Sequence, residues 1–134
     1  MATNYKAIAK KLKFEGRAFI NGKYVNAIDG KKFETINPAT GEKLCSVAKC
    51  NHKDVNLAVK VSRKAFNSGV WSKSSPEYRK EVLLKFAELL RKAGDENSVL
   101  ECVDTGKLIA DCINEVANDA PMHFQWYGEL IDKV

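Results

Sequence analysis

The chain has 134 residues, of which 45% are hydrophobic and 29% are charged, and its formal net charge is +5. This composition is ordinary for one compact globular unit and argues against a disordered or fibrous chain. No apolar run approaches the ~20 residues that span a bilayer, and the first residues lack the apolar segment of a secretory signal, so we expect a cytoplasmic protein with no membrane partner.

The first 16 residues form a basic arm. Its lysines, Lys6, Lys10, Lys11 and Lys13, have only Glu15 as an acidic neighbour in sequence. Such a cluster fits either a solvated, partly helical tail or an arm that binds nucleic acid or a membrane surface. Apolar residues alternate with the lysines, and basic clusters often give false positives, so we favour the tail and do not expect a nucleic-acid partner.

Residues 17–50 alternate apolar and polar side chains around three turn signals, which predicts antiparallel strands. The strongest signal is Asn21-Gly22, the two-residue hairpin turn in which both residues need a positive φ. Asp29-Gly30 marks a second turn and residues 37–41 a third, between strands near residues 33–36 and 43–48. We therefore expect a small layer of β-hairpins.

Helical spacing begins at Asn51, which can cap a helix that stops at Ser68-Gly69. The strongest helix signal in the chain covers residues 74–93, where Ser75 can cap and Pro76 suits the first helical position. Its apolar residues recur at three- and four-residue steps, so one side must be buried. A third helix is expected from Asp95 to Gly106.

The last segment, residues 109–134, keeps one apolar stripe in phase although Pro121 lies in its middle. Proline removes the hydrogen bond to the carbonyl of Ala117, which predicts either a kink or a short helix followed by a longer one that starts near Asn118 or Asp119. The stripe also continues to Val134 without a capping residue, so the sequence looks like the front end of something larger. We expect that stripe to bind another copy of the chain.

The four cysteines, Cys45, Cys50, Cys102 and Cys112, lack the C-x-x-C spacing of a zinc knuckle. A cytoplasmic chain has little use for structural disulfides, so we expect core or incidental thiols. The sequence also contains no G-x-G-x-x-G, P-loop or H-E-x-x-H motif.

Several blocks of residues together resemble the N-terminal segment of NAD(P)-dependent aldehyde dehydrogenases. They are FINGKYV, FETINPATGEKL, DVNLAVKVSRKAF, SGVWSKSSPEYRKEVLLKFAELLRK, LECVDTGK and WYGELIDKV, in the family's order and spacing over about residues 17–134. Among its branches the chain is most similar to the amino-aldehyde enzymes, such as the γ-glutamyl-γ-aminobutyraldehyde and betaine aldehyde dehydrogenases. One departure is Leu108, which stands where the family usually has proline.

The resemblance implies an α/β parent with a Rossmann-type domain, of which this chain supplies the β-hairpins (17–50) and about four α-helices (51–134), truncated before the nucleotide-binding core. The parent would oxidise aldehydes with NAD or NADP and form a homo-oligomer. No catalytic or cofactor-binding residue of the family falls within this chain, so we expect the N-terminal fragment alone to be inactive and to bind no cofactor.

Two sites are implied by the same resemblance. Thr35, the Ile36 carbonyl and Asp104 match positions that hold a structural monovalent cation in some members, although Asp104 fits equally well as a group that hydrogen-bonds a nearby turn. Glu115 and Asp119 lie four residues apart on a helix and match the mouth of the aldehyde channel, where carboxylates would attract a cationic amino-aldehyde. A solvated surface is the alternative for this pair.

The main alternative function is a small basic helical domain that binds a protein or nucleic acid, which only the net charge and the lysine arm support. Its affinity for nucleic acid would fall steeply with salt. A structural metal-binding module ranks third.

Overall fold

The computed structural model describes residues 3–133, and these form two compact units rather than the single unit expected from composition. We call residues 14–36 and 41–74 the hairpin unit, and residues 1–13, 37–40 and 75–134 the helical unit. No helix among the described residues is long and apolar enough to cross a bilayer.

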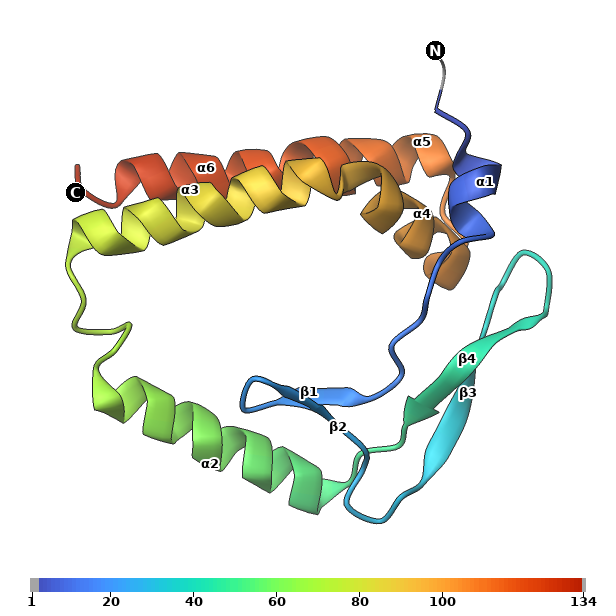
Figure 1. The fold of residues 1–134 in the computed structure, drawn as a ribbon, viewed down its shortest axis with the longest axis horizontal. Coiled ribbons are helices and arrows are strands. Elements are labelled where there is room, and N and C mark those ends of the chain that lie inside the picture. Colours follow the sequence, from blue (N-terminus) through green and yellow to red (C-terminus); the bar gives the residue numbers. More distant parts are fainter. Residues whose placement is uncertain (1–2, 134) are drawn as a thin grey trace. The chain divides into compact units, whose positions relative to one another are not determined.

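The hairpin unit begins with strands β1 (Ala18–Ile20) and β2 (Lys23–Val25), which pair antiparallel (Figure 1). Asn21 and Gly22 join them with φ angles of 55° and 74°, so both residues of the predicted turn adopt the positive φ that it requires. The Asn21-Gly22 prediction is confirmed.

A second hairpin pairs β3 (Lys32–Ile36) with β4 (Lys43–Ala48), close to the strands expected from sequence. The register shifts between Thr35 and Ile36. The backbone of Gly16 lies directly against β4, because its carbonyl accepts the Ala48 N–H at 2.7 Å and a Cβ there would stand 2.1 Å from the Ser46 carbonyl oxygen. Only glycine fits this approach.

Helix α2 (His52–Ser68) follows, and its ends are those predicted: Asn51 and Asp54 form a capping box, and Gly69 ends the helix with φ 79°. Asp54 has a further role, since it is only 2% exposed and its carboxylate accepts both the Asn51 N–H at 2.8 Å and the Ile28 N–H at 2.9 Å. It therefore ties the segment after β2 to the start of α2.

The helical unit is built on α3 (Pro76–Lys92), which lies beside α6 (Ala120–Leu130) (Figure 1). The two run antiparallel, since Lys80 near the start of α3 pairs with Asp132 just beyond α6 at 2.7 Å. Ser75 caps α3 and Pro76 occupies its first turn, as predicted. The expected apolar stripe is only partly covered, because Ala87 is fully buried whereas Phe86 is 41% exposed.

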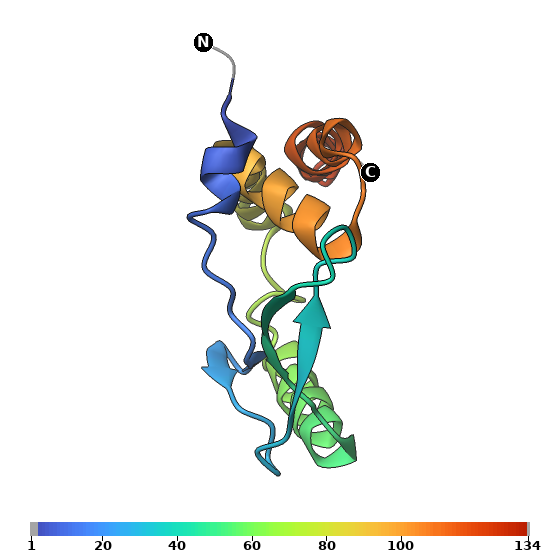
Figure 2. The same ribbon diagram turned by 90° about the vertical axis from the view of Figure 1, so that its right-hand side faces the viewer.

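Helix α4 (Gly94–Thr105) ends at Gly106, whose φ of 78° confirms the predicted left-handed cap. The short α1 (Tyr5–Ala9), capped by Asn4, packs on α4, and Figure 2 shows the two in contact from another direction. The basic arm is thus partly helical, as expected, but it is docked rather than freely solvated.

The chain then forms α5 (Ile109–Cys112) and a π-helix, η1 (Ile113–Asp119), before α6. The Ala120 N–H donates to the Glu115 carbonyl five residues back, so the wider winding delivers the fully buried Pro121 to the first turn of α6, where its missing N–H costs little. Of the two predicted outcomes, a short helix followed by a longer one is closer, with π-helix in place of a break.

Candidate functional site

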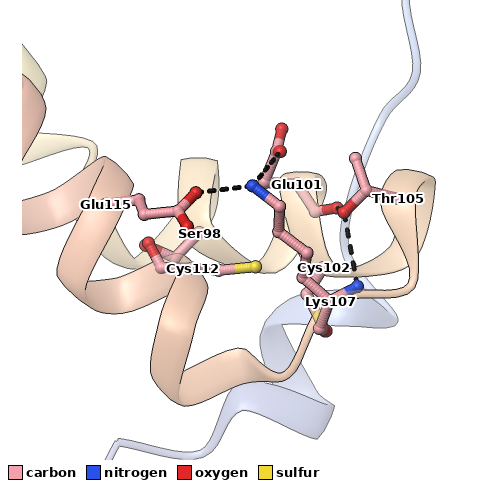
Figure 3. Close-up of polar contacts among 7 residues, drawn as sticks. All are labelled: Ser98, Glu101, Cys102, Thr105, Lys107, Cys112 and Glu115. Atoms are coloured by element: carbon pink, nitrogen blue, oxygen red, sulfur yellow. Dashed lines mark hydrogen bonds and ion pairs between the residues drawn. The ribbon is translucent and has the colours of Figure 1, made fainter.

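A cluster of polar contacts in the helical unit surrounds Lys107, just after the Gly106 turn. Figure 3 shows the members of this Lys107 cluster: Ser98, Glu101, Cys102, Thr105, Lys107, Cys112 and Glu115. The Lys107 ammonium lies 2.5 Å from a Glu115 carboxylate oxygen and 3.7 Å from one of Glu101. One lysine thereby links the end of α4 to η1.

Backbone geometry around the turn fixes where this lysine stands. The Thr105 hydroxyl donates to the Glu101 carbonyl at 2.7 Å and accepts the Lys107 N–H at 3.4 Å. The Gly106 position has room only for glycine, since a Cβ would meet the Pro38 ring at 2.8 Å and φ is positive. Lys107 is therefore presented by a tightly built turn.

The electrostatics of the cluster favour a fixed charge rather than proton transfer. The hydrogen bond to Glu115, helped by the charges of Glu115 and Glu101, raises the pKa of Lys107. An ammonium held in this way remains protonated at neutral pH, so it cannot serve as a general base. Its chemistry is charge compensation and positioning.

The two thiols in the cluster differ in burial. Cys112 is fully buried, and burial raises the pKa of its thiol, with Cys102 adding to the rise. The Cys102 thiol donates to the Lys107 carbonyl at 3.2 Å. All four cysteines are free: Cys112 is a core residue as expected, Cys45 and Cys102 are half-buried, and Cys50 is exposed.

The structure places both predicted channel-mouth carboxylates on η1. Glu115 is about half exposed and bound to Lys107, a partner that sequence spacing did not indicate. Asp119 is exposed at the other end of η1, and its carbonyl oxygen lies 2.7 Å from Nδ1 of His123. Their role at a substrate channel stays a prediction.

The residues of the predicted cation site are divided between the units. Thr35 and Ile36 belong to β3 in the hairpin unit, whereas Asp104 is exposed near the end of α4 in the helical unit. Among residues 3–133 no group of three or more His, Cys, Asp or Glu side chains is arranged to hold a metal ion, but the predicted site relies on a hydroxyl and a carbonyl as well. It also stays a prediction.

The described residues contain no strand–turn–helix arrangement of the Rossmann type for a dinucleotide. A nucleotide site of the Rossmann type needs a parallel strand that leads through a glycine-rich turn into a helix N-terminus. Within residues 3–133 the strands form two antiparallel hairpins, β1 with β2 and β3 with β4. No step of a reaction with NAD(P) can be assigned to these residues.

Comparison with known proteins identifies the family. The model of the "Aldehyde dehydrogenase family" matches residues 24–134. The chain belongs to this family. An aminoacetaldehyde dehydrogenase of Pseudomonas aeruginosa is 42% identical over 97% of this chain, which corresponds to 26% of that relative.

Solved structures agree with the family match. The γ-glutamyl-γ-aminobutyraldehyde dehydrogenase of Burkholderia cenocepacia superposes with a TM-score of 0.93 at 42% identity, and the indole-3-acetaldehyde dehydrogenase of P. syringae, solved in complex with NAD+, with 0.92 at 40%. Each match covers 97% of this chain and 26% of the solved one. The chain thus spans about a quarter of the length of its relatives, and its hairpins and helices match an N-terminal aldehyde dehydrogenase segment.

Proposed function

We propose that this chain is the N-terminal segment of an enzyme that oxidises aldehydes to carboxylic acids with NAD(P)+. The observation that carries the proposal is the agreement between sequence and fold along 97% of the chain with enzymes of that activity. The cofactor accepts the hydride in this chemistry. The alternative of a basic nucleic-acid-binding domain has no comparable support.

The contribution of the segment is structural, with the reacting groups supplied by other parts of the parent. Its cysteines are free, burial raises the pKa of the Cys112 thiol, and Lys107 is held as a cation by Glu115. These properties support a role in shaping and charging the surroundings of a site rather than in bond making.

The activity proposal is tested by comparing residues 1–134 with the full-length parent. NAD(P)H absorbance in the presence of an amino-aldehyde should rise only with the parent, and titration calorimetry should detect no tight binding of NAD+ or NADP+ to the segment. Turnover or tight cofactor binding by the segment alone would contradict the proposed division of roles.

We propose amino-aldehydes as the substrate class. The support is the similarity to the aminoacetaldehyde and γ-glutamyl-γ-aminobutyraldehyde enzymes, together with the exposed carboxylates of η1. A carboxylate at a channel mouth attracts a substrate ammonium group without contacting the reacting carbonyl. Because Lys107 already compensates Glu115, we assign Asp119 the larger share of this attraction.

In the parent, Asp119→Asn should raise the KM for cationic amino-aldehydes and leave that for neutral aliphatic aldehydes nearly unchanged. Glu115→Gln should do the same more weakly, and Glu96→Gln, an exposed carboxylate on α4, is the matched control. Equal changes in KM for both substrate classes would show that Glu115 and Asp119 belong to an ordinary solvated surface and do not attract the substrate.

We also propose a homo-oligomeric parent and the monovalent cation site. The stripe predicted to bind another copy is partly covered within the chain, since Phe124 stacks edge-on against Phe86 at 4.7 Å, but Tyr127 remains 62% exposed. Light scattering of the parent tests whether it forms a homo-oligomer.

For the cation site, the melting temperature of the parent in potassium and in choline salts should differ, and Asp104→Asn should abolish the difference.

A further inference from the structure

Two cysteines of the Lys107 cluster face each other across the turn between α4 and α5. Cys102 lies in the last turn of α4 and Cys112 at the end of α5. In Figure 3 the sulfur of Cys112 lies on the side of its residue that faces Cys102.

Hydrogen bonds show that the face of α4 that carries Cys102 is packed against this segment. Ser98 stands one helical turn before Cys102, on the same face, and its hydroxyl donates to the Cys112 carbonyl at 3.3 Å. The Cys102 thiol itself donates to the Lys107 carbonyl at 3.2 Å. Cys102 thus contacts the connection between α4 and α5, and Ser98 contacts the last residue of α5.

The thiols differ in access, which sets an order for their reaction. Cys102 is half-buried and reachable from solvent, whereas Cys112 is fully buried. Cys45 and Cys50 belong to the hairpin unit, so within the helical unit the cysteines are these two. The influence of Cys102 on the pKa of Cys112 agrees with their proximity.

We propose that Cys102 and Cys112 are a redox modification site that closes to an intramolecular disulfide when the protein meets a hydroperoxide. The Cys102 sulfur attacks the peroxide oxygen and becomes a sulfenic acid, while hydrogen peroxide is reduced and releases one water. The Cys112 sulfur then attacks the sulfenic sulfur, forms the S–S bond and displaces the hydroxyl, which leaves as a second water with the Cys112 proton. Two thiols and one peroxide thus give one disulfide and two waters.

Closure changes the Lys107 cluster. Cys102 loses the S–H that it donates to the Lys107 carbonyl, and the bond ties α4 to α5 across the Gly106 turn. A disulfide needs Cα atoms about 4.4–6.8 Å apart, so its formation also measures how closely the end of α5 approaches this face of α4.

The test uses the chain with Cys45→Ser and Cys50→Ser, so that only the proposed pair remains. Trypsin cuts after Lys92, Lys107 and Lys133, which puts Cys102 in the peptide 93–107 and Cys112 in the peptide 108–133. After treatment with hydrogen peroxide under native conditions and removal of the oxidant, mass spectrometry should find these two peptides joined, with the loss of two hydrogens, and separated again by a reductant.

Two variants test the order in which the two cysteines react. In Cys112→Ser the Cys102 sulfenic acid cannot be resolved, so dimedone should label Cys102; in Cys102→Ser, Cys112 should stay unlabelled. Native oxidation that leaves both thiols free for alkylation would overturn the proposal. So would labelling of Cys112 ahead of Cys102, or an equal yield of the joined peptides when the chain is oxidised in urea.

Discussion

The hairpin unit and the helical unit are held together in different ways. Buried positions of the helical unit are mostly small, which lets helices approach closely: they include Ala87, Gly94, Ser98, Cys112 and Gly128. In the hairpin unit few side chains are buried, and the central one is a carboxylate, Asp54, that accepts backbone N–H groups. Close packing stabilises one unit and a polar junction the other.

Charge is divided just as unevenly. The hairpin unit has 11 basic and 5 acidic residues, a net charge of +6, whereas the helical unit has 11 basic and 12 acidic residues, a net charge of −1. Within the helical unit, residues 1–13 carry four lysines and no acidic residue, while residues 75–134 carry 7 basic and 12 acidic ones. This complementarity favours docking of the basic arm on α4 over a free tail.

The largest effect is expected at the polar junction. Asp54→Ala leaves the partly buried N–H groups of Ile28 and Asn51 without their acceptor, which should lower the free energy of unfolding of the hairpin unit by about 3 kcal/mol. The two tryptophans lie one in each unit, so urea unfolding followed by Trp71 fluorescence in a Trp126→Phe background reports this unit.

Glu34→Ala is the matched control for Asp54, because it removes an exposed carboxylate paired with Lys43 and should change the same transition by less than about 0.5 kcal/mol. Equal losses for the two variants would show that the hairpin unit does not depend on a polar junction.

Close packing in the helical unit is tested by Gly94→Ala. Alanine is normally the better helix residue, but a Cβ at this position would lie 2.9 Å from the Cβ of Ala117 on η1. We expect a loss of about 1–2 kcal/mol from overpacking, measured by Trp126 fluorescence in a Trp71→Phe background. Glu96→Ala, on the exposed side of the same helix, should be nearly neutral, and a stabilised Gly94→Ala variant would refute close packing here.

The smallest expected effect is the loss of folding stability at low pH. Hydrogen bonds from Arg17 lower the pKa of Glu15 from 4.5 to about 2, and a hydrogen bond from Lys80 lowers that of Asp132. A lowered folded-state pKa contributes stability above the unfolded value that is lost as pH falls through the folded one. Glu15 and Arg17 are two residues apart and can pair in the unfolded chain too, whereas Lys80 and Asp132 are 52 apart.

Acid should therefore destabilise the helical unit through Asp132 more than the hairpin unit through Glu15. Urea midpoints are measured between pH 5 and about 2. In Asp132→Asn the midpoint of the helical unit, followed by Trp126 fluorescence, should depend less on pH than in the unmodified chain. In Glu15→Gln the pH dependence of the hairpin unit, followed by Trp71 fluorescence, should change little. The reverse ranking would mean that the local Glu15–Arg17 pair is specific to the folded state.

Features that depend on neighbouring residues could be predicted from the sequence. Asn21-Gly22, the cap at Ser75 and the helix end at Gly106 each rest on the conformational preference of one or two residues, and all three are confirmed. Resemblance to the family located the hairpins and helices in the correct order.

Features that depend on distant residues could not be predicted from the sequence. The second hydrogen bond of Asp54 comes from Ile28, 26 residues earlier, and no local pattern marks it. Lys107 meets Glu115 only because Gly106 turns the chain and η1 winds more widely than an α-helix. The π-helix itself reconciles the buried Pro121 with a continuous helical path, a solution that periodicity alone does not reveal.

The chain order of the two units has a consequence for biosynthesis. All residues of the hairpin unit are present once Ser74 has been made, whereas the helical unit combines residues 1–13 and 37–40 with residues 75–134. At about 5–20 residues per second, a ribosome needs roughly 3–12 s to add those last 60 residues. During that interval the nascent arm has no α4 to dock on, so Ile8 and Leu12, which are half-buried in the folded unit, lack their packing partners.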